Sequence, residues 1–313
     1  NDTLRGLGGA DTLIGGDGID TADYDGSTGG VTVSLDDGTG AGGHAQGDVL
    51  SEIENLTGSA SDDVLTGNAE DNVLDGANGN DALLGLAGAD TLIGGEGSDT
   101  LTGGTGADDI QGGTGVDTAS YLGSTVGVTV NLATATTGGG DAAGDVLTGI
   151  ENLQGSDNAD QLTGDGGANT LLGESGDDRL EGLGGNDSLD GGAGTDNADY
   201  SASTAAVTVD LAAGTATGTA IGTDTLPAIE DVTGGSGADR LTGDSVANSL
   251  VGNGGNDSLF GGAGSDNLSG GANNDELTGG ADADVLDGGD GIDTALYQLS
   301  LQAVTVDLAA GTG

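Results

Sequence analysis

The sequence predicts an all-β fold built from short strands and tight turns that repeat every nine residues. Residues 76–120 show this as five consecutive nonapeptides in one phase: GANGNDALL, GLAGADTLI, GGEGSDTLT, GGTGADDIQ and GGTGVDTAS. Gly suits the turns because it adopts strained backbone conformations without a Cβ penalty. An Asp stands sixth in each unit, and an apolar residue stands eighth, on the opposite face from the seventh and ninth side chains. Each nonapeptide is therefore a turn followed by a three-residue strand with one inward side chain.

The composition excludes a conventional globular core. The chain has 70 Gly among 313 residues, a net charge of −50, one Phe, and no Trp or Met. Taken without the repeats, these values are typical of disordered chains. Too few large apolar side chains are present for a thick core, so repetition has to replace it.

The charge also limits the partners. Nearly all of it comes from Asp and Glu, against three Arg and no Lys, so nucleic acid and anionic membranes are repelled and cations are attracted. The absence of Cys excludes disulfides and thiolate metal sites and is compatible with export. No apolar run approaches the length of a membrane span or a signal-peptide core, so we expect no membrane insertion. Because the chain begins without Met and stops within a repeat, we expect it to be an excerpt.

Inserts of constant length interrupt the repeats. Each begins at a Tyr, with V-T-V-x-L starting seven residues later and, in the complete copies, I-E-N or I-E-D starting twenty-nine residues later. Identical length in three complete copies indicates built elements, because free loops vary in length. The predicted segments are 1–23 (end of a block), 24–57 (insert), 58–120 (seven nonapeptides), 121–154 (insert), 155–199 (five nonapeptides), 200–233 (insert), 234–296 (seven nonapeptides) and 297–313 (start of a further insert).

We expect each insert to form an irregular coil of the same fold. In the first copy, Val31, Val33 and Leu35 alternate as in a strand with one buried face. Leu50, Ile53 and Leu56 are spaced three residues apart, but the segment is too short to predict a helix.

The turn pattern has a specific chemistry. A G-G-x-G turn aims backbone carbonyls inward, and a carboxylate placed directly after it completes a shell of hard oxygen ligands, which suits Ca²⁺. The pattern resembles the RTX (repeats-in-toxin) calcium-binding β-roll of bacterial type I-secreted surface-layer proteins, adhesins and exoenzymes. This resemblance implies a parallel β-roll, or β-solenoid, of stacked 18-residue coils. The Tyr-to-Tyr spacings are 97, 79 and 97 residues and thus differ by one coil, which supports the roll.

The resemblance also implies multiple Ca²⁺ ions between successive coils, so that unit n pairs with unit n+2, as Asp81 with Asp99. Turn formation alone is the alternative role for these Asp side chains, but stacked columns of carboxylates repel one another unless a cation neutralises them. The expected metal ligands are the sixth-position acids Asp11, Asp20, Asp63, Asp81, Asp90, Asp99, Asp108, Asp117, Asp160, Asp178, Asp187, Asp196, Asp239, Asp257, Asp266, Asp275, Asp284 and Asp293.

Two rules recur at the block ends. The second unit of each complete block carries Asn in place of Asp, at Asn72, Asn169 and Asn248, and we expect these turns to bind metal weakly or not at all. The last unit carries Ala at the inward eighth position, with a Tyr two residues later. We expect the small Ala to make room for the Tyr inside the roll, in the pairs Ala22 with Tyr24, Ala119 with Tyr121, Ala198 with Tyr200 and Ala295 with Tyr297.

No catalytic arrangement is visible outside the repeats, and His44 stands alone in a Gly- and Ala-rich stretch, so we predict that the chain is not an enzyme. We expect it to be expanded without metal and to fold on Ca²⁺ after secretion, because metal binding free energy becomes folding free energy.

The favoured function is a rigid extracellular element on the surface of a Gram-negative bacterium: a surface layer, filament or adhesin stalk, with calcium, copies of itself or cell-surface components as partners. The alternative is the secretion and folding module of an RTX exoenzyme or toxin whose active domain lies elsewhere. A sugar- or ice-binding module fits less well, because exposed aromatic residues and regular ranks of Thr are both lacking.

Overall fold

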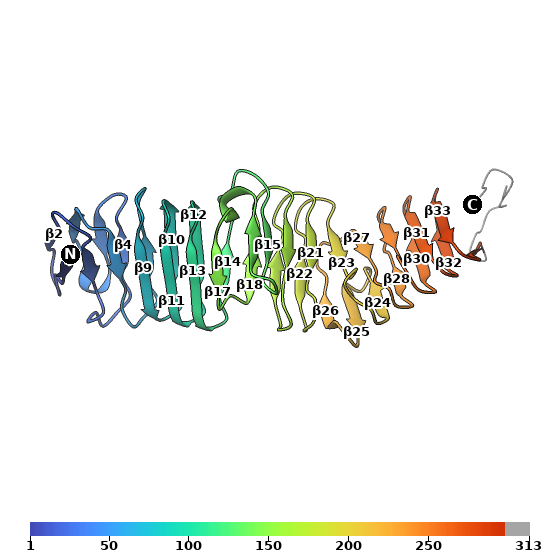
Figure 1. Cartoon of the computed structure of the whole chain (residues 1–313), viewed down its shortest axis with the longest axis horizontal. Helices are drawn as coiled ribbons and strands as arrows, with labels where there is room; N and C mark the ends of the chain where they lie inside the picture. Colours follow the sequence, from blue (N-terminus) through green and yellow to red (C-terminus); the bar gives the residue numbers. More distant parts are fainter. Residues whose placement is uncertain (298–313) are drawn as a thin grey trace. The chain divides into compact units, whose positions relative to one another are not determined.

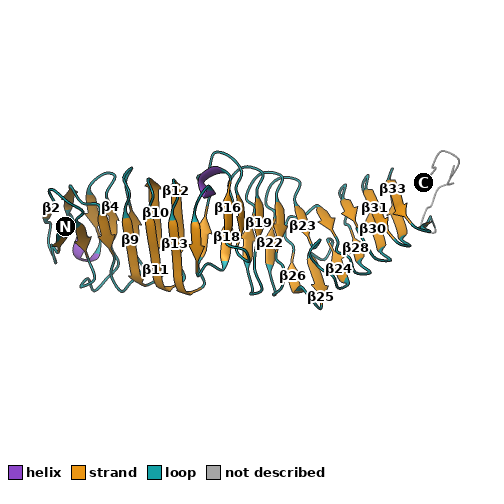
Figure 2. Cartoon of the chain, viewed as in Figure 1, coloured by secondary structure: helices purple, strands orange, loops and turns teal. Residues whose placement is uncertain are grey.

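The structure, a computed structural model, describes residues 1–297 of the chain, which forms two compact units, Asn1–Gln161 and Leu162–Gly313. Each unit consists of short β-strands joined by turns (Figures 1 and 2). The helical segments among the described residues are two 3-10 turns, η1 (Gly43–Ala45) and η2 (Gly140–Ala142). Within the same residues no helix is long and apolar enough to cross a membrane. The predicted all-β class is confirmed.

In the first unit most strands lie in two sheets, and the strands of consecutive nonapeptides alternate between them. One sheet has the order β1 (Thr3–Leu4), β3 (Thr21–Asp23), β7 (Asn55–Thr57), β9 (Val73–Asn78), β11 (Thr91–Gly97), β13 (Asp109–Gly115) and β17 (Val146–Thr148). The other has the order β2 (Thr12–Ile14), β6 (Val49–Ser51), β5 (Thr39–Ala41), β4 (Thr32–Ser34), β8 (Val64–Thr66), β10 (Ala82–Ala87), β12 (Thr100–Thr105), β14 (Thr118–Ser120) and β18 (Asn152–Gln154).

The second unit repeats this plan. One sheet has the order β20 (Thr170–Leu172), β22 (Ser188–Asp190), β26 (Gly222–Thr225), β25 (Thr215–Gly218), β24 (Val207–Asp210), β28 (Arg240–Thr242), β30 (Ser258–Gly262), β32 (Glu276–Gly280) and β34 (Thr294–Ala295). The other has the order β21 (Arg179–Glu181), β23 (Asn197–Asp199), β27 (Asp231–Thr233), β29 (Ser249–Val251), β31 (Asn267–Ala272) and β33 (Val285–Asp290). The strand β19 (Gln161–Thr163) contains the boundary between the units.

The register of the sheets confirms the stacked 18-residue coil. Leu83 pairs with Leu101, and Leu92 pairs with Ile110, in parallel ladders eighteen residues apart. Because like positions stack on like positions, the eighth-position side chains form two internal columns. Leu65, Leu74, Leu83, Leu92, Leu101, Ile110, Leu171, Leu180, Leu189, Leu241, Leu250, Leu259, Leu268 and Leu277 are all buried.

Each insert adds antiparallel strands to this parallel stack. In the first insert β4, β5 and β6 form an antiparallel meander whose outer strands pair in parallel with β8 and β2. In the third insert β24, β25 and β26 do the same between β28 and β22. In the second insert β15 (Thr129–Asn131) and β16 (Thr136–Gly138) form an antiparallel pair. The expected irregular coil therefore contains a meander, because the chain reverses direction inside the insert before it rejoins the stack.

The last described coil differs from the expectation. Ala22, Ala119 and Ala198 are buried together with Tyr24, Tyr121 and Tyr200, as predicted. In the fourth copy Ala295 is exposed, Tyr297 is 44 % exposed, and Leu286, predicted as core, is only half-buried. No further coil of the described residues covers this one, and the rest of that insert, with V-T-V-x-L starting at Val304, lies outside residues 1–297.

Candidate metal centres

The turns of the regular repeats reverse the chain through a left-handed residue at their second position. Ala77 has φ 75° and Leu86 has φ 82°, although a residue with a Cβ loses free energy in this region. The fourth position is equally constrained, as Gly79 shows with φ 128°. Neighbouring coils thus hold these turns in a conformation that local preference does not favour.

The acid at the sixth position joins each turn to its neighbour in the stack. The backbone N–H of Asp81 donates to Oδ1 of Asp99 at 2.8 Å, and that of Asp90 donates to Oδ1 of Asp108 at 2.8 Å. The same bond joins Asp257 to Asp275 at 2.8 Å. These bonds bring together carboxylates of units n and n+2, and the carboxylates form columns along the roll.

The second oxygen of these carboxylates is buried without a hydrogen-bond partner. Among the described residues this is true of Oδ2 of Asp11, Asp20, Asp81, Asp90, Asp99, Asp108, Asp117, Asp187, Asp196, Asp257, Asp266 and Asp275. Asp178 occupies the same position of its repeat. A buried carboxylate oxygen without a hydrogen-bond donor is costly. Because the same unsatisfied oxygen recurs along the stack, it points to a cation-binding position rather than to a local defect.

Oδ2 faces a small space that we call the turn cradle, bounded by the first Gly of the repeat, the Asp Oδ2 atom and a backbone carbonyl of the next coil. A Cβ placed on Gly94 would lie 2.4 Å from Oδ2 of Asp99 and 2.5 Å from the carbonyl oxygen of Gly112. A Cβ on Gly76 would lie 2.4 Å from Oδ2 of Asp81 and 2.8 Å from the carbonyl oxygen of Gly94. Two oxygens therefore converge where a larger residue would fill the space.

The cradle offers one carboxylate and backbone carbonyls. Within residues 1–297 no group of three or more His, Cys, Asp or Glu side chains gathers as in a conventional all-side-chain site. Hard oxygen donors of mixed charge fit Ca²⁺, which accepts carbonyl and carboxylate ligands in flexible geometry. The residues present fit the ion, and when bound it would supply the positive charge that the columns lack.

Burial makes these carboxylates unfavourable as free anions. It raises the pKa of Asp81 to about 7, together with the charges of Asp63 and Asp99 and against the hydrogen bond from the backbone N–H of Asp63. Burial raises the pKa of Asp90 and of Asp257 to about 6, again with a contribution from carboxylates in the same column. A cation in the cradle can replace the proton that each group otherwise tends to hold.

The first turn of each complete block is built differently. Oδ2 of Asp63, Asp160 and Asp239 accepts a hydrogen bond from the backbone N–H four residues earlier, in Ser59, Ser156 and Gly235. Their second-position residues are not left-handed. In these turns a backbone donor satisfies the carboxylate oxygen that has no partner in the regular turns.

The Asn units have the same kind of turn, which we call closed because a backbone N–H of the turn donates to the sixth-position side chain. The Asn side chain also has a second role. The N–H of Asn68 donates to Oδ1 of Asn72 at 2.7 Å. Nδ2 of Asn72 donates to the carbonyl oxygen of Glu54 at 2.8 Å, and Nδ2 of Asn248 donates to that of Glu230 at 2.7 Å. An Asp could not make this bond, so Asn here links the second unit of the block to the preceding insert.

Sequence reasoning missed the acids of the inserts. Asp48, Asp145 and Asp224 accept backbone N–H groups from Asp11, Asp108 and Asp187, thirty-seven residues earlier. Their other oxygen accepts the hydroxyl of Tyr24, Tyr121 or Tyr200, each at 3.2 Å. The signal available in the sequence was the recurrence of an Asp twenty-four residues after each Tyr. These acids dock each insert onto the block before it.

The carboxylates of Asp284 and Asp293 close the described column. Their Oδ1 atoms accept the N–H groups of Asp266 and Asp275 at 3.1 and 3.0 Å. Both side chains are only partly buried, in keeping with their place in the last described coils.

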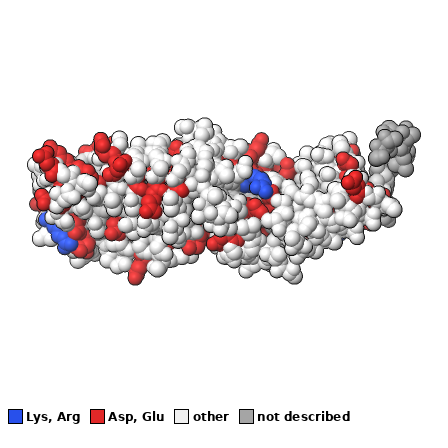
Figure 3. Space-filling model, viewed as in Figure 1, with Lys and Arg blue, Asp and Glu red and all other residues white. Residues whose placement is uncertain are grey.

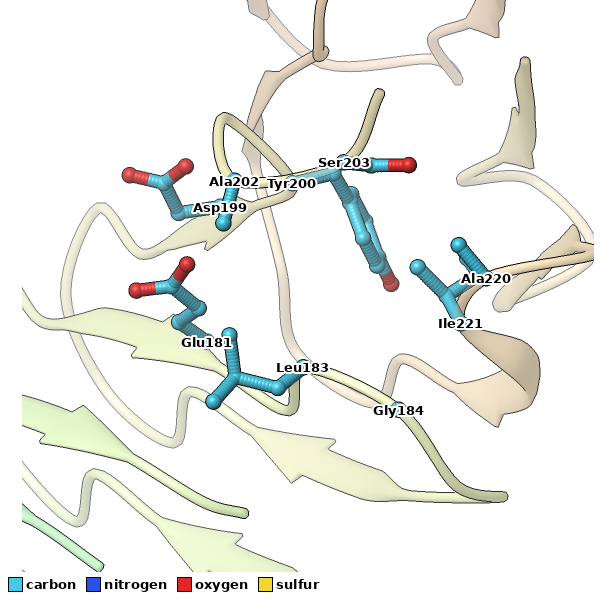
Figure 4. Close-up of a pocket in the computed structure, with 9 residues that line it drawn as sticks. All are labelled: Glu181, Leu183, Gly184, Asp199, Tyr200, Ala202, Ser203, Ala220 and Ile221. Carbon is cyan, nitrogen blue, oxygen red and sulfur yellow. The ribbon is translucent and has the colours of Figure 1, made fainter. Parts of the chain in front are cut away.

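A pocket of about 190 Å³ lies beside the third insert (Figure 4). Glu181, Leu183, Tyr200 and Ile221 are among its lining residues. It is smaller than the roughly 300–1,000 Å³ typical of small-molecule sites. We therefore do not assign it a ligand.

A parallel β-roll whose turns present buried carboxylate and carbonyl oxygens defines the class of calcium-binding repeat proteins. The family model of the RTX calcium-binding nonapeptide repeat matches residues 1–22, 51–83, 84–119, 145–180, 163–198, 233–268 and 260–295. These segments cover more than half of the chain, and the chain belongs to this family. The match is to a calcium-binding structural repeat rather than to a catalytic domain. No curated protein matches the chain.

Proposed function

We propose that this chain is an extracellular structural region that folds on Ca²⁺ after secretion and then forms a rigid element of the cell surface, as in a surface layer, filament or adhesin stalk. The observation that carries the proposal is the column of buried carboxylates whose Oδ2 atoms lack a hydrogen-bond donor. We propose Ca²⁺ in the left-handed turns, and no ion in the closed turns of Asp63, Asp160 and Asp239.

The charge of the molecule supports this proposal. Figure 3 shows acidic side chains over the visible face and few basic ones. Arg5 pairs with Asp23 at 2.6 Å, and Arg179 pairs with Asp199 and Glu181. These pairs lie outside the columns, so Arg5 and Arg179 leave the cradle carboxylates unneutralised. With −50 of net charge and 70 Gly to order, folding needs a favourable contribution from a cation.

Secretion follows from the same energetics. Extracellular calcium modules bind with Kd values of roughly 10⁻⁴ to 10⁻³ M. A chain of this affinity stays unfolded in a cytosol poor in Ca²⁺ and folds outside the cell. The unfolded chain is the form that a narrow export channel accepts. The long stack without a catalytic arrangement favours a spacer or lattice role, since each coil contacts its neighbours and length is easily extended.

Far-UV circular dichroism of the full chain tests calcium-gated folding. We expect a disordered spectrum in EDTA and a β spectrum after addition of millimolar Ca²⁺. Mg²⁺ at the same concentration is the control and should not restore the β signal, because it demands a tighter octahedral shell. A β signal that survives chelation would contradict the proposal.

The surface role has a separate test. Electron microscopy of the full chain with Ca²⁺ should show ordered sheets or filaments if copies of the chain assemble. Isolated particles under all calcium concentrations would argue for a spacer or for the folding module of a longer exoprotein.

A further inference from the structure

In the three blocks that a complete insert follows, the last repeat has no repeat of the next coil to complete its cradle, and the insert takes that place. A Cβ on Gly15 would lie 1.9 Å from the carbonyl oxygen of Glu52, and a Cβ on Gly112 would lie 1.9 Å from that of Gly149. At Gly191 the corresponding distance to the carbonyl oxygen of Ala228 is 2.2 Å. Each insert thus delivers a carbonyl to the position that the next repeat occupies elsewhere.

The carboxylates of these cradles are fully buried and have an oxygen without a partner. Asp20, Asp117 and Asp196 are each 0 % exposed, and their Oδ2 atoms accept no hydrogen bond. These oxygens lie 2.8, 2.8 and 2.6 Å from the same Cβ points, so each faces the insert carbonyl. The three junctions show one arrangement although their carbonyl residues are Glu, Gly and Ala.

The inserts hold this carbonyl in a defined way. Glu52, Gly149 and Ala228 have φ of 56°, 63° and 50°, and two of the three carry a Cβ that disfavours this region. Two residues later, a Glu carboxylate accepts the backbone N–H of the same Asp. These bonds are 2.7 Å from Asp20 to Glu54, 2.8 Å from Asp117 to Glu151 and 2.9 Å from Asp196 to Glu230.

We propose that each insert completes a divalent-cation site at the end of the preceding block, formed by Oδ2 of the last repeat's Asp and the insert carbonyl. The block-end sites are Asp20 with Glu52, Asp117 with Gly149, and Asp196 with Ala228. The proposal rests on the proposed calcium function of the regular turns. Its consequence is that calcium binding and docking of the insert are a single event, so the inserts are part of the calcium-dependent fold.

The test is a triple variant of the full chain, Asp20→Asn, Asp117→Asn and Asp196→Asn. Asn keeps an Oδ1 atom that can accept the N–H groups of Asp2, Asp99 and Asp178, so the backbone bonds of the stack are retained. Equilibrium dialysis should show three fewer Ca²⁺ per chain than the unchanged protein. The matched control, Asp81→Asn, Asp90→Asn and Asp257→Asn, removes the same charge from regular turns and should also lose ions.

Terbium luminescence checks that the block-end variant keeps its fold, because Tb³⁺ replaces Ca²⁺ at oxygen sites and is excited only by a nearby aromatic ring. The hydroxyls of Tyr24, Tyr121 and Tyr200 donate to Asp48, Asp145 and Asp224, which also accept the N–H groups of Asp11, Asp108 and Asp187, the sixth-position acids of the repeats before the block-end repeats. We expect Tyr-sensitised emission from the cradles of those acids to persist in the block-end variant while three ions are lost. If the triple variant does not fold, Asp117→Asn alone carries the test, with loss of one ion.

Retention of the full ion count in the block-end variant would overturn this inference while leaving calcium-gated folding intact. An unchanged protein that binds no Ca²⁺ would instead refute the proposed function itself.

Discussion

Asn72 differs from the Asp of the regular repeats at one side-chain atom, and that atom changes its role. It is 1 % exposed, its Oδ1 accepts a turn N–H, and its Nδ2 donates to the Glu54 carbonyl. An amide satisfies both partners, whereas a carboxylate at this position would place one of its oxygens against the carbonyl oxygen of Glu54. The Asn units therefore join a block to an insert.

Asn72→Asp should destabilise the calcium-loaded protein by about 1–3 kcal/mol, because it removes the donor and leaves two buried acceptors facing each other. The measurement is the midpoint of urea unfolding at saturating Ca²⁺. Asn68→Asp is the control, since Oδ1 of Asn68 accepts the N–H of Glu70, an Asp keeps that acceptor, and the charge change is the same. An Asn72→Asp variant that is as stable as the control, or that binds an additional ion, would contradict the structural role.

Tyr121 anchors the second insert through its hydroxyl. Burial raises the pKa of the Tyr121 phenol well above its usual range, so the group stays protonated and donates to Asp145. Burial also raises the pKa of Asp145 to about 6, although the Tyr121 hydroxyl acts in the opposite direction. Tyr121→Phe should cost about 1–3 kcal/mol, because it leaves Oδ2 of Asp145 without that donor.

Thermal unfolding at saturating Ca²⁺ measures this change. Tyr297→Phe is the matched control, since Tyr297 is 44 % exposed and its variant should unfold with the unchanged protein. Equal unfolding temperatures for the two variants would show that the hydroxyl of Tyr121 does not anchor the insert.

At the scale of the element, the coil stabilises the fold through contacts with its two neighbours. Leu92 on β11 is 0 % exposed and pairs in register with Leu74 on β9 and Ile110 on β13. Because the roll is a linear stack, a cavity in one coil weakens that coil and its neighbours before distant ones.

Leu92→Ala should destabilise the calcium-loaded protein by about 2–5 kcal/mol, the cost of a large-to-small change in a packed core. Hydrogen exchange should show reduced protection in β9, β11 and β13 and little change in β2 and β6. Val64→Ala, at a strand position that is 45 % exposed, is the control and should change protection little. Uniform loss of protection across the first unit would contradict a stack of locally coupled coils.

At the scale of the whole molecule, the effect of pH on folding depends on whether Ca²⁺ is present. In the metal-free fold burial raises the pKa of Asp81 to about 7 and of Asp90 and Asp257 to about 6, above the value of 3.8 that each has when unfolded. Between these pKa values the folded chain binds more protons than the unfolded chain. Its stability therefore falls as the pH rises through this window.

In EDTA, acidification from pH 8 to about pH 4 should therefore favour the β structure, which circular dichroism measures. In Ca²⁺ the trend reverses, because protons compete with the ion for the same carboxylates, so more Ca²⁺ should be needed to fold the chain at pH 5 than at pH 7. A calcium midpoint independent of pH would show that the buried carboxylates are not the ligands.

The repeat pattern was sufficient to predict the coil, because each prediction depended on residues close in sequence. The Gly-rich turns, the eighth-position core residues such as Leu92, and the alignment of Asp81 with Asp99 all follow from a period of nine residues and two strands per coil. Which sixth-position acids hold metal remains a prediction for the experiments above.

The sequence by itself determined the roll, its core columns and its stacked carboxylates, since a strict period brings like residues together at every coil. Only the tertiary structure decided which turns are open. The turn of Leu86 lacks the double Gly, yet Leu86 is left-handed. The turn of Gly235 has the double Gly, yet Gly235 is not left-handed. The turn that contains Gly235 stacks on the preceding insert, where the N–H of Ser236 donates to the carbonyl oxygen of Ser203. The state of a turn thus depends on its neighbour in the stack, which lies a coil or an insert away in the sequence.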